Sequence, residues 1–525
     1  MRCRLCGCGF APMRCRLCGG CGFALMKCRL CGCGFALMRY GALRLWMLPN
    51  VPIDKRRRGN QMANRVITVD FSKKCGKIKP MNCINGAPRS GGYDLSYDVS
   101  EEFSKMVIPA VRAVLPSGEY GLNQFIDIHC IFPDFSADEN DENSYNFLPT
   151  DQYLASIKAV GAEIFYRLGE SAEPYSRKMF ISAPKDPEKW ARICEHIIMH
   201  YNEGWANGFK LGIKNWEIWS SPDSSLGFVG EPSDFYELYR VTANHLRERF
   251  PRIRIGGYGC SGFYSLNRLS ASEEMKGYIP FMQNFLNYIT KEETSAPLDF
   301  FTWACYTSNP DELALHIKYA RSYLDAAGLK RTKSIICEYN TVQKGDTPPA
   351  LSPDYPSELG AAMILAQKSS ADMMMYSTSD VRSKKNGLFT FDDHTSAHRY
   401  AAFNVMRAYG RLYKLGAAYD VGGDYRKELY SLAARGKDEG AIMLVARAYS
   451  GRVEIALKDC PFKTCSVIKT VPGGERGEGR VFRAERIAIN GSKIILPVKE
   501  NEIFEISLTD MTESAPQNPD LQEAE

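Results

Sequence analysis

Short apolar runs alternate with longer helical patterns eight times between residues 77 and 410, and no other feature constrains the fold as strongly. Buried strands that alternate with helices form a parallel sheet, and eight such units close a barrel. The strands are predicted at 78–84, 124–131, 161–168, 214–219, 252–257, 298–304, 333–338 and 371–377. A doubly wound open sheet is the alternative, but it predicts a G-x-G-x-x-G motif after the first strand, where the sequence has none.

A helix is predicted after each strand, and the pattern is clearest over 187–205. There Trp190, Ile193, Ile197 and Ile198 recur with the spacing that places them on one side of a helix. The predicted helices cover about 99–115, 149–159, 187–205, 232–249, 273–290, 311–328, 356–370 and 396–410. The sequence therefore predicts an α/β fold, namely a (β/α)8 TIM barrel.

The helical patterns stop after about residue 411, and short strand-like runs separated by Gly and Asp/Asn turns follow. Such runs are typical of a β-sandwich. They cover 428–434, 440–447, 452–457, 464–470, 480–488, 492–497 and 502–507. The predicted organisation is a barrel over 62–410, a C-terminal β-sandwich domain over 411–510 and a disordered acidic tail over 511–525, with 65–70 as a candidate extra strand of the sandwich.

Residues 1–61 differ from the rest of the chain and are predicted to lie outside the fold. Three near-copies of one Cys-rich segment begin at Met1, Met13 and Met26. Each copy contains C-x-x-C, a pattern that suits zinc, but no histidine accompanies the cysteines and no apolar pattern could pack around a metal. A translated DNA repeat ahead of a natural start at Met62 explains this leader better.

Charge and cysteine content change at the same place. Residues 1–61 hold 12 Lys/Arg and one acid, which leaves 54 basic and 60 acidic residues in the rest of the chain. A body with this balance lacks the basic footprint of a nucleic-acid-binding protein. Nine of the 18 cysteines lie within Cys3–Cys33 and the others are scattered singly, which indicates free thiols in a reducing compartment.

No run approaches the ~18 apolar residues of a membrane span, and the apolar patch at 43–48 is too short for a secretory signal, so we expect a cytoplasmic protein without a membrane partner.

Side chains at the C-terminal ends of the predicted strands are the candidates for an active site, because barrel enzymes place their catalytic groups there. The sharpest candidate is Glu338, a carboxylate directly after the apolar run Ile335–Cys337. A salt bridge at the rim of the barrel is the structural alternative. His129 is predicted on the second strand, Glu170 after the third and Tyr306 at the end of the sixth.

Two of these strand-end motifs resemble glycoside hydrolase family 39, the β-xylosidase and α-L-iduronidase family. Trp216–Asp223 (WEIWSSPD) resembles the family's W-E-I-W-N-E-P-D, and Cys337–Asn340 (CEYN) resembles its T-E-W-N nucleophile segment. Weaker likenesses at Lys74–Asn85 and Asn386–Phe389 extend the match to most of residues 66–510. The resemblance implies a retaining glycosidase whose acid/base comes from strand four and whose nucleophile comes from strand seven.

The resemblance makes Glu338 the nucleophile, but Ser220 and Ser221 stand where the family has its Asn-Glu pair. The acid/base carboxylate is therefore missing at Ser221. A retaining glycosidase uses two carboxyl groups roughly 5–5.5 Å apart, and general acid/base help is worth typically about 10²–10⁴ in rate. Asp223 and Glu170 are candidate substitutes for the missing acid/base. Asp223 lies two residues after Ser221 and directly follows a proline, so its side chain could face the mouth of the barrel.

Three further departures from the family also fall at the barrel mouth. The family's H-x-Y on strand six reads Ala304–Tyr306 (ACY), its N-N-G-P reads Asn85–Pro88 (NGAP), and Ser377–Asp380 (STSD) replaces the aromatic and basic residues expected after strand eight. The resemblance implies that the sugar contacts a set of side chains at this end of the barrel. They are His129, Trp219, Ser220, Ala304, Tyr306 and Asn340.

The sequence thus predicts a retaining glycoside hydrolase acting on O-glycosidic bonds of xylosides, arabinosides or uronic-acid glycosides, impaired because Ser221 replaces the acid/base. The alternative is a non-catalytic carbohydrate-binding protein on the same barrel. A metal-dependent hydrolase is a third reading, but the chain has seven histidines and no H-x-H or H-E-x-x-H motif. We expect no cofactor and no metal site, and we expect an oligosaccharide or glycoside as the ligand. The sequence does not decide whether the chain forms a homo-oligomer.

Overall fold

The structure is a computed structural model that separates at Met62 into two units, Met1–Gln61 and Met62–Glu525. It describes residues 64–89, 98–114, 125–173, 175–342, 349–378, 387–391, 397–423, 427–474, 477, 479–489, 492–510 and 522–523. The Cys-rich leader lies outside the described residues. None of the helices in the described ranges has the length and apolar character that crossing a membrane requires.

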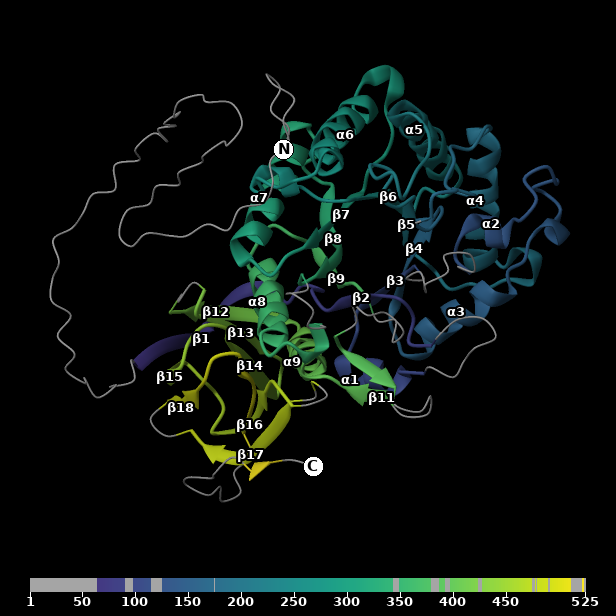
Figure 1. The fold of residues 1–525 in the computed structure, drawn as a ribbon. Helices are drawn as coiled ribbons and strands as arrows, with labels where there is room; N and C mark the ends of the chain where they lie inside the picture. The colour runs from purple at the N-terminus through teal and green to yellow at the C-terminus, as the bar shows by residue number, and fades with distance from the viewer. Residues whose placement is uncertain are drawn as a thin grey trace, which may run out of the picture. The chain divides into compact units, whose positions relative to one another are not determined.

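The predicted barrel is confirmed: eight strands close in the order β2 to β9, each pairing in parallel with the next, as Figure 1 shows. They are β2 (Cys83–Asn85), β3 (Ala110–Ala113), β4 (Glu163–Leu168), β5 (Asn215–Ile218), β6 (Arg254–Cys260), β7 (Phe300–Tyr306), β8 (Lys333–Asn340) and β9 (Met373–Tyr376). One apolar layer fills the barrel interior, and it is formed by Cys83, Ala110, Phe165, Phe300, Ile335, Cys337 and Met375. The interior is therefore a packed core at this level.

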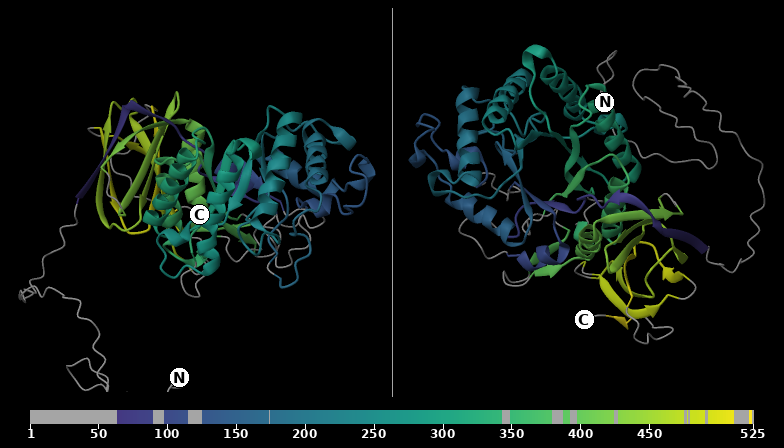
Figure 2. Two further views of the ribbon diagram at one scale, coloured as in Figure 1. Left: turned by 90° about the horizontal axis from the view of Figure 1, so that it is seen from above. Right: turned by 180° about the vertical axis from the view of Figure 1, so that it is seen from behind.

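Helices surround the strands, a ring that Figure 1 and the right-hand view of Figure 2 show. They are α1 (Ser100–Met106), α2 (Ile128–Ile131), α3 (Leu148–Ala159), α4 (Pro187–Asn202), α5 (Pro232–Arg249), α6 (Glu273–Ile289), α7 (Pro310–Ala326), α8 (Tyr355–Gln367) and α9 (Ala401–Leu415). The start of α4 has a clear local cause, because the Asp186 side chain accepts a hydrogen bond from the Lys189 backbone N–H and Pro187 occupies the first turn. Its apolar side buries Trp190, Ile193 and Ile197 against the barrel core, as the spacing predicted.

The prediction for the second strand is wrong. The strand is β3 (Ala110–Ala113), inside the segment predicted to be helical, whereas 124–131 contains the four-residue helix α2 with His129. The apolar run there alternates like a strand, but Ile128, Ile131 and Phe132 are also spaced for a helix, and all three are buried. A short apolar run suits either structure, so only packing decides between them.

The remaining strands form a ten-stranded sheet in the order β18-β15-β1-β12-β13-β14-β19-β16-β17-β20. They are β1 (Asn64–Lys77), β12 (Ala417–Gly422), β13 (Leu429–Arg435), β14 (Glu439–Ala446), β15 (Gly451–Lys458), β16 (Thr464–Val471), β17 (Arg480–Ala488), β18 (Lys493–Val498), β19 (Ile503–Thr509) and β20 (Gln522–Glu523). Strands from opposite parts of this order, such as β18 and β16, bury side chains in one core, so the sheet folds over on itself. Two short strands, β10 (Phe389–Phe391) and β11 (Ala397–Arg399), pair separately.

Both ends of the described chain join this sheet. At the N-terminal end, β1 pairs antiparallel with β12 and parallel with β15, with bulges between Asp70 and Gly76. Within the tail expected to be disordered, Gln522–Glu523 (β20) pairs antiparallel with β17. The face of β13 and β14 that points away from the sheet's own core packs on α8 and α9, where a Cβ on Gly360 would lie 2.8 Å from Cγ2 of Val445. The sheet and the barrel therefore share buried surface.

We expect a chain that begins at Met62 to melt at the same temperature as the full chain. The three hydrophobic core clusters of the described residues are built from residues between Ile67 and Leu508, so removing 1–61 deletes none of these core side chains. Calorimetry of the two proteins side by side tests this. A fall of several degrees in Tm, or a stoichiometric zinc ion bound by the full chain alone, would contradict it.

Candidate active site

Glu338 lies on β8 at the mouth of the barrel, with 28% of its side chain exposed. One carboxylate oxygen, Oε1, accepts a hydrogen bond from Nη1 of Arg112 at 3.0 Å, and the other, Oε2, accepts one from the Tyr306 hydroxyl at 2.7 Å. Burial, reinforced by the neighbouring Glu338 carboxylate, raises the pKa of the Tyr306 hydroxyl, which therefore stays protonated as a donor. Both oxygens of Glu338 are thus held in place at an accessible position.

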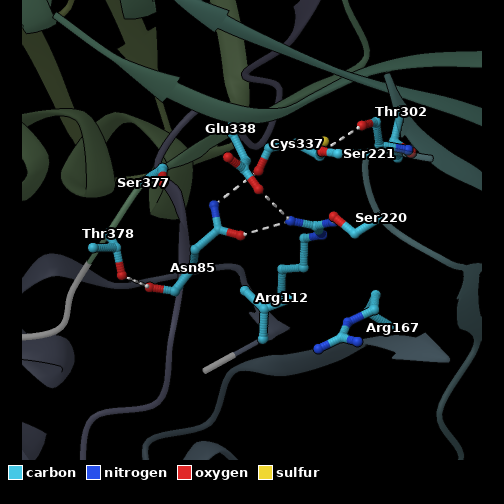
Figure 3. Close-up of polar contacts among 12 residues, drawn as sticks. Asn85, Arg112, Arg167, Ser220, Ser221, Thr302, Cys337, Glu338, Ser377 and Thr378 are labelled. Atoms are coloured by element: carbon cyan, nitrogen blue, oxygen red, sulfur yellow. Dashed lines mark hydrogen bonds and ion pairs between the residues drawn. The ribbon is translucent and has the colours of Figure 1, made fainter. Parts of the chain in front are cut away.

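Arg112, on β3, is the centre of this network and is fully buried (Figure 3). Its Nε donates to Oε2 of Glu217 at 2.6 Å, and its Nη1 also donates to Oδ1 of Asn85 at 3.2 Å. Burial alone would lower the pKa of the guanidinium, but the carboxylates of Glu217 and Glu338 raise it, so Arg112 keeps its charge. Sequence reasoning missed this residue because it expected a helix there.

Two further groups tie the first and last strands of the barrel to the site. Asn85, at the end of β2, donates from Nδ2 to the carbonyl oxygens of Cys337 and Tyr376, at 2.8 and 3.2 Å. The Ser377 hydroxyl, just after β9, lies 3.1 Å from that of Tyr306. The strand ends β2, β3, β7, β8 and β9 therefore meet around Glu338, as Figure 3 shows for the labelled residues.

Ser220 and Ser221 follow β5 and face different partners. The Ser220 hydroxyl accepts a hydrogen bond from Nη2 of Arg112 at 3.2 Å, so it belongs to the network around Glu338. The Ser221 hydroxyl donates to the carbonyl oxygen of Gly259 on β6 at 3.1 Å. Where the sequence resemblance predicts the acid/base, the chain therefore presents a hydroxyl bonded to the backbone.

Asp223 is directed towards the loop after β6. Its Oδ1 accepts a hydrogen bond from the Ser261 hydroxyl at 2.7 Å and its Oδ2 one from the Ser261 backbone N–H at 2.9 Å. Burial raises the pKa of Asp223 to about 6, a value that suits an acid near neutral pH. Its oxygens are nevertheless engaged by Ser261, so acting on a leaving group would require that contact to open.

His129 and Glu170 form a pair beside the end of β4. Nδ1 of His129 lies 2.5 Å from Oε2 of Glu170, and the His129 backbone N–H donates to Oε1 at 3.1 Å. Together with Asp127 they offer ligand atoms within 4.8 Å of one another, a spacing that a metal ion could use. Asp127 already accepts hydrogen bonds from Arg167 and Ser171, and a guanidinium at that carboxylate opposes a second cation.

The other residues expected to contact a sugar lie deeper. Trp219 is 1% exposed, packs against Trp190 and donates from its indole N–H to the Gly227 carbonyl at 2.8 Å. Asn340 is 2% exposed and donates to the Ser377 carbonyl at 2.7 Å. Ala304, on β7, is also buried. Of that set, the partly exposed groups are His129, Ser220 and Tyr306.

A model of the family described as glycosyl hydrolases family 39 matches residues 109–348, which run from just before β3 to just after β8. The matched segment carries Arg112, the two serines, Tyr306 and Glu338. The resemblance to glycoside hydrolase family 39 is confirmed. The matched segment thus supplies β3, β7 and β8 to the Glu338 network, whereas Asn85 on β2 and Ser377 after β9 lie outside it.

Named relatives support the same resemblance. A curated β-xylosidase from Geobacillus stearothermophilus is 23% identical over 210 residues, which cover 38% of this chain and 37% of that protein. The match thus spans little more than a third of the relative's length. Among solved structures, a glucosidase from Croceicoccus marinus aligns with a TM-score of 0.70 at 20% identity, over 86% of this chain and 100% of that one. A family-39 β-xylosidase from Caulobacter crescentus aligns with a TM-score of 0.61 at 15% identity, over 85% and 100%. At these identities the structural likeness shows the barrel fold with its added sheet.

Proposed function

We propose that this chain acts on O-glycosides by the retaining mechanism, with Glu338 as the nucleophile and with turnover slowed by the missing acid/base. The observation that carries the proposal is the environment of Glu338, a partly exposed carboxylate at the barrel mouth with each oxygen held by one donor. In a retaining reaction such a carboxylate attacks the anomeric carbon, and a covalent glycosyl-enzyme intermediate forms. Arg112 and Tyr306 would orient Glu338 for this attack.

The proton transfers of the reaction are the steps that this chain performs poorly. The departing oxygen needs a proton from the acid/base, and the water that later attacks the intermediate must give a proton to that same group, on the side of the glycosidic bond opposite the nucleophile. A serine hydroxyl such as that of Ser221 is too weak an acid to protonate the leaving oxygen and too weak a base to deprotonate the water at neutral pH. Slow formation and slow hydrolysis of the intermediate follow, and only the formation becomes faster when the leaving group needs no proton.

The names of the relatives support only a broad substrate class. Their names include a β-xylosidase and a glucosidase, which act on different sugars. We propose an O-glycoside of a pentose, hexose or uronic acid as the ligand.

Covalent trapping tests the nucleophile. A glycoside fluorinated beside the anomeric carbon and carrying an activated leaving group should label Glu338, because trapping depends on the nucleophile more than on the acid. Peptide mapping by mass spectrometry locates the label. Glu217 is the internal control, since it bonds to the same guanidinium but is fully buried. A label on another carboxylate, with Glu338 untouched, would show the assignment to be wrong.

A carbohydrate-binding protein is the second candidate. The observation that favours it is that the hydroxyl of Ser221 is bonded to the Gly259 carbonyl and the carboxylate oxygens of Asp223 are bonded to Ser261. On that view the mouth still holds a sugar, but Glu338 forms no intermediate.

A further inference from the structure

Cys130 lies in a chain of three contacts that the proposed glycosidase chemistry does not use. Its Sγ is 3.3 Å from Nε2 of His129, and Nδ1 of the same imidazole is 2.5 Å from Oε2 of Glu170. The thiol, the base and the group that orients the base therefore stand in series. This is the arrangement in which an imidazole activates a nucleophile.

The imidazole is fixed in this orientation from several sides. Its ring stacks on Phe180, with centroids 3.6 Å apart and planes within 2° of parallel. The His129 backbone N–H donates to Oε1 of Glu170, so that carboxylate holds both the main chain and the ring. With Nδ1 directed to Glu170, Nε2 is left to exchange a proton with the Cys130 sulfur.

The groups around the pair favour a protonated imidazole. Burial alone would lower the pKa of His129, but its contacts with Cys130 and Glu170 raise it to about 10. Burial also raises the pKa of Glu170 to about 7, and Asp127 acts in the same direction, whereas His129 and Arg167 oppose the rise. A protonated imidazole beside the sulfur is one of the environments in which cysteines become reactive.

We propose that Cys130 is a nucleophilic thiol that exchanges with small disulfides and so forms a reversible modification site beside the end of β4. The Cys130 sulfur attacks one sulfur of the small disulfide, a new S–S bond joins the two, and the original S–S bond breaks. The proton that His129 took from the thiol goes to the departing thiolate, so one free thiol is released for each protein mixed disulfide formed.

Cys75 provides the comparison within the same molecule. It is exposed and its Sγ lies 3.7 Å from the backbone oxygen of Lys73, whereas Cys130 is half-buried. If exposure governed reactivity, Cys75 would react first. If the imidazole governs it, Cys130 reacts first at low pH and the two rates converge as Cys75 ionises.

The test is alkylation of the full chain by iodoacetamide across a pH series, with the rate at each cysteine read by peptide mapping. An ordinary thiol with a pKa of about 8.5 is roughly 1% thiolate at about pH 6.5. Since a thiolate of lower pKa is also a weaker nucleophile, we expect Cys130 to react about tenfold faster than Cys75 there. Glutathione disulfide at the same pH should form its mixed disulfide on Cys130 before Cys75.

Two variants separate activation from exposure. His129→Gln removes the base and should bring the alkylation rate of Cys130 at about pH 6.5 below that of Cys75, while Glu170→Gln should lower it less, because an amide oxygen can still accept from the ring. The unmodified chain decides the matter even if a variant fails to fold. A Cys130 rate no greater than that of Cys75 at low pH, or absence of the glutathione adduct under conditions that modify Cys75, would overturn the proposal.

Discussion

Replacing Ser220 by Asn and Ser221 by Glu together should raise hydrolysis of glycosides with poor leaving groups by about 10²–10⁴, the range that general acid/base catalysis supplies. The substitution returns a carboxyl group to the strand end next to the Glu338 network, where the wild-type chain has a hydroxyl bonded to the Gly259 carbonyl. Position 221 has φ +51°, and because serine already carries a Cβ, glutamate adds no backbone constraint of its own. Initial rates on matched alkyl and aryl glycosides measure the gain.

The unmodified chain should show the complementary behaviour. With a dinitrophenyl glycoside, whose leaving group needs no proton, the intermediate should form quickly and hydrolyse slowly, which gives a burst. Azide needs no base, so it should speed turnover and give a glycosyl azide that keeps the substrate's anomeric configuration. Ala304→His is the informative addition, since it restores the H-x-Y motif next to Tyr306 and should add to the gain if that histidine helps to hold the sugar.

A binding protein would give the opposite pattern. There would be no burst, no azide product and no gain from the three replacements, while sugar affinity stayed unchanged. That outcome would remove the enzyme proposal and leave the barrel and its ligand class in place.

Arg112→Met should lower the free energy of unfolding by about 3–5 kcal/mol, the cost of breaking a buried ion pair by removing one partner. Arg112 and Glu217 both have fully buried side chains, and their contact is 2.6 Å. Without the guanidinium, Glu217 is left as an unpaired charge in the barrel interior, and Glu338 loses one of its two donors. Urea denaturation measures the change as a shift of the midpoint at constant slope.

The matched control replaces both partners. Arg112→Met with Glu217→Leu removes the uncompensated charge, so much of the lost stability should return, because well-packed apolar residues can substitute for a buried pair. Lys276→Met is the surface control: it breaks the contact with Glu273, whose side chain is 91% exposed, and should change the midpoint little. A single Arg112→Met variant as stable as the wild type would show that the buried charge model is wrong.

Much of the architecture follows from the sequence, because it depends on local patterns. Seven of the eight barrel strands lie where apolar runs predicted them, and all seven runs after residue 411 form strands. The position of Glu338 beside Tyr306 also follows, since parallel strands deliver their C-terminal residues to the same end of a barrel. Periodicity and strand direction are properties of a single segment or of neighbouring segments, and a sequence displays them directly.

Arg112, His129 and Cys130 could only be placed by the tertiary structure. A four-residue segment that carries an arginine does not look like a strand of a barrel interior. The partners that stabilise Arg112 there, Glu217 and Glu338, are 105 and 226 residues away in the sequence. His129 and Cys130 belong to a helix that alternates like a strand, and Glu170, which completes their contacts, is 41 residues further on. A buried charge or an activated thiol is defined by partners from other strands, and those contacts exist only once the barrel has closed.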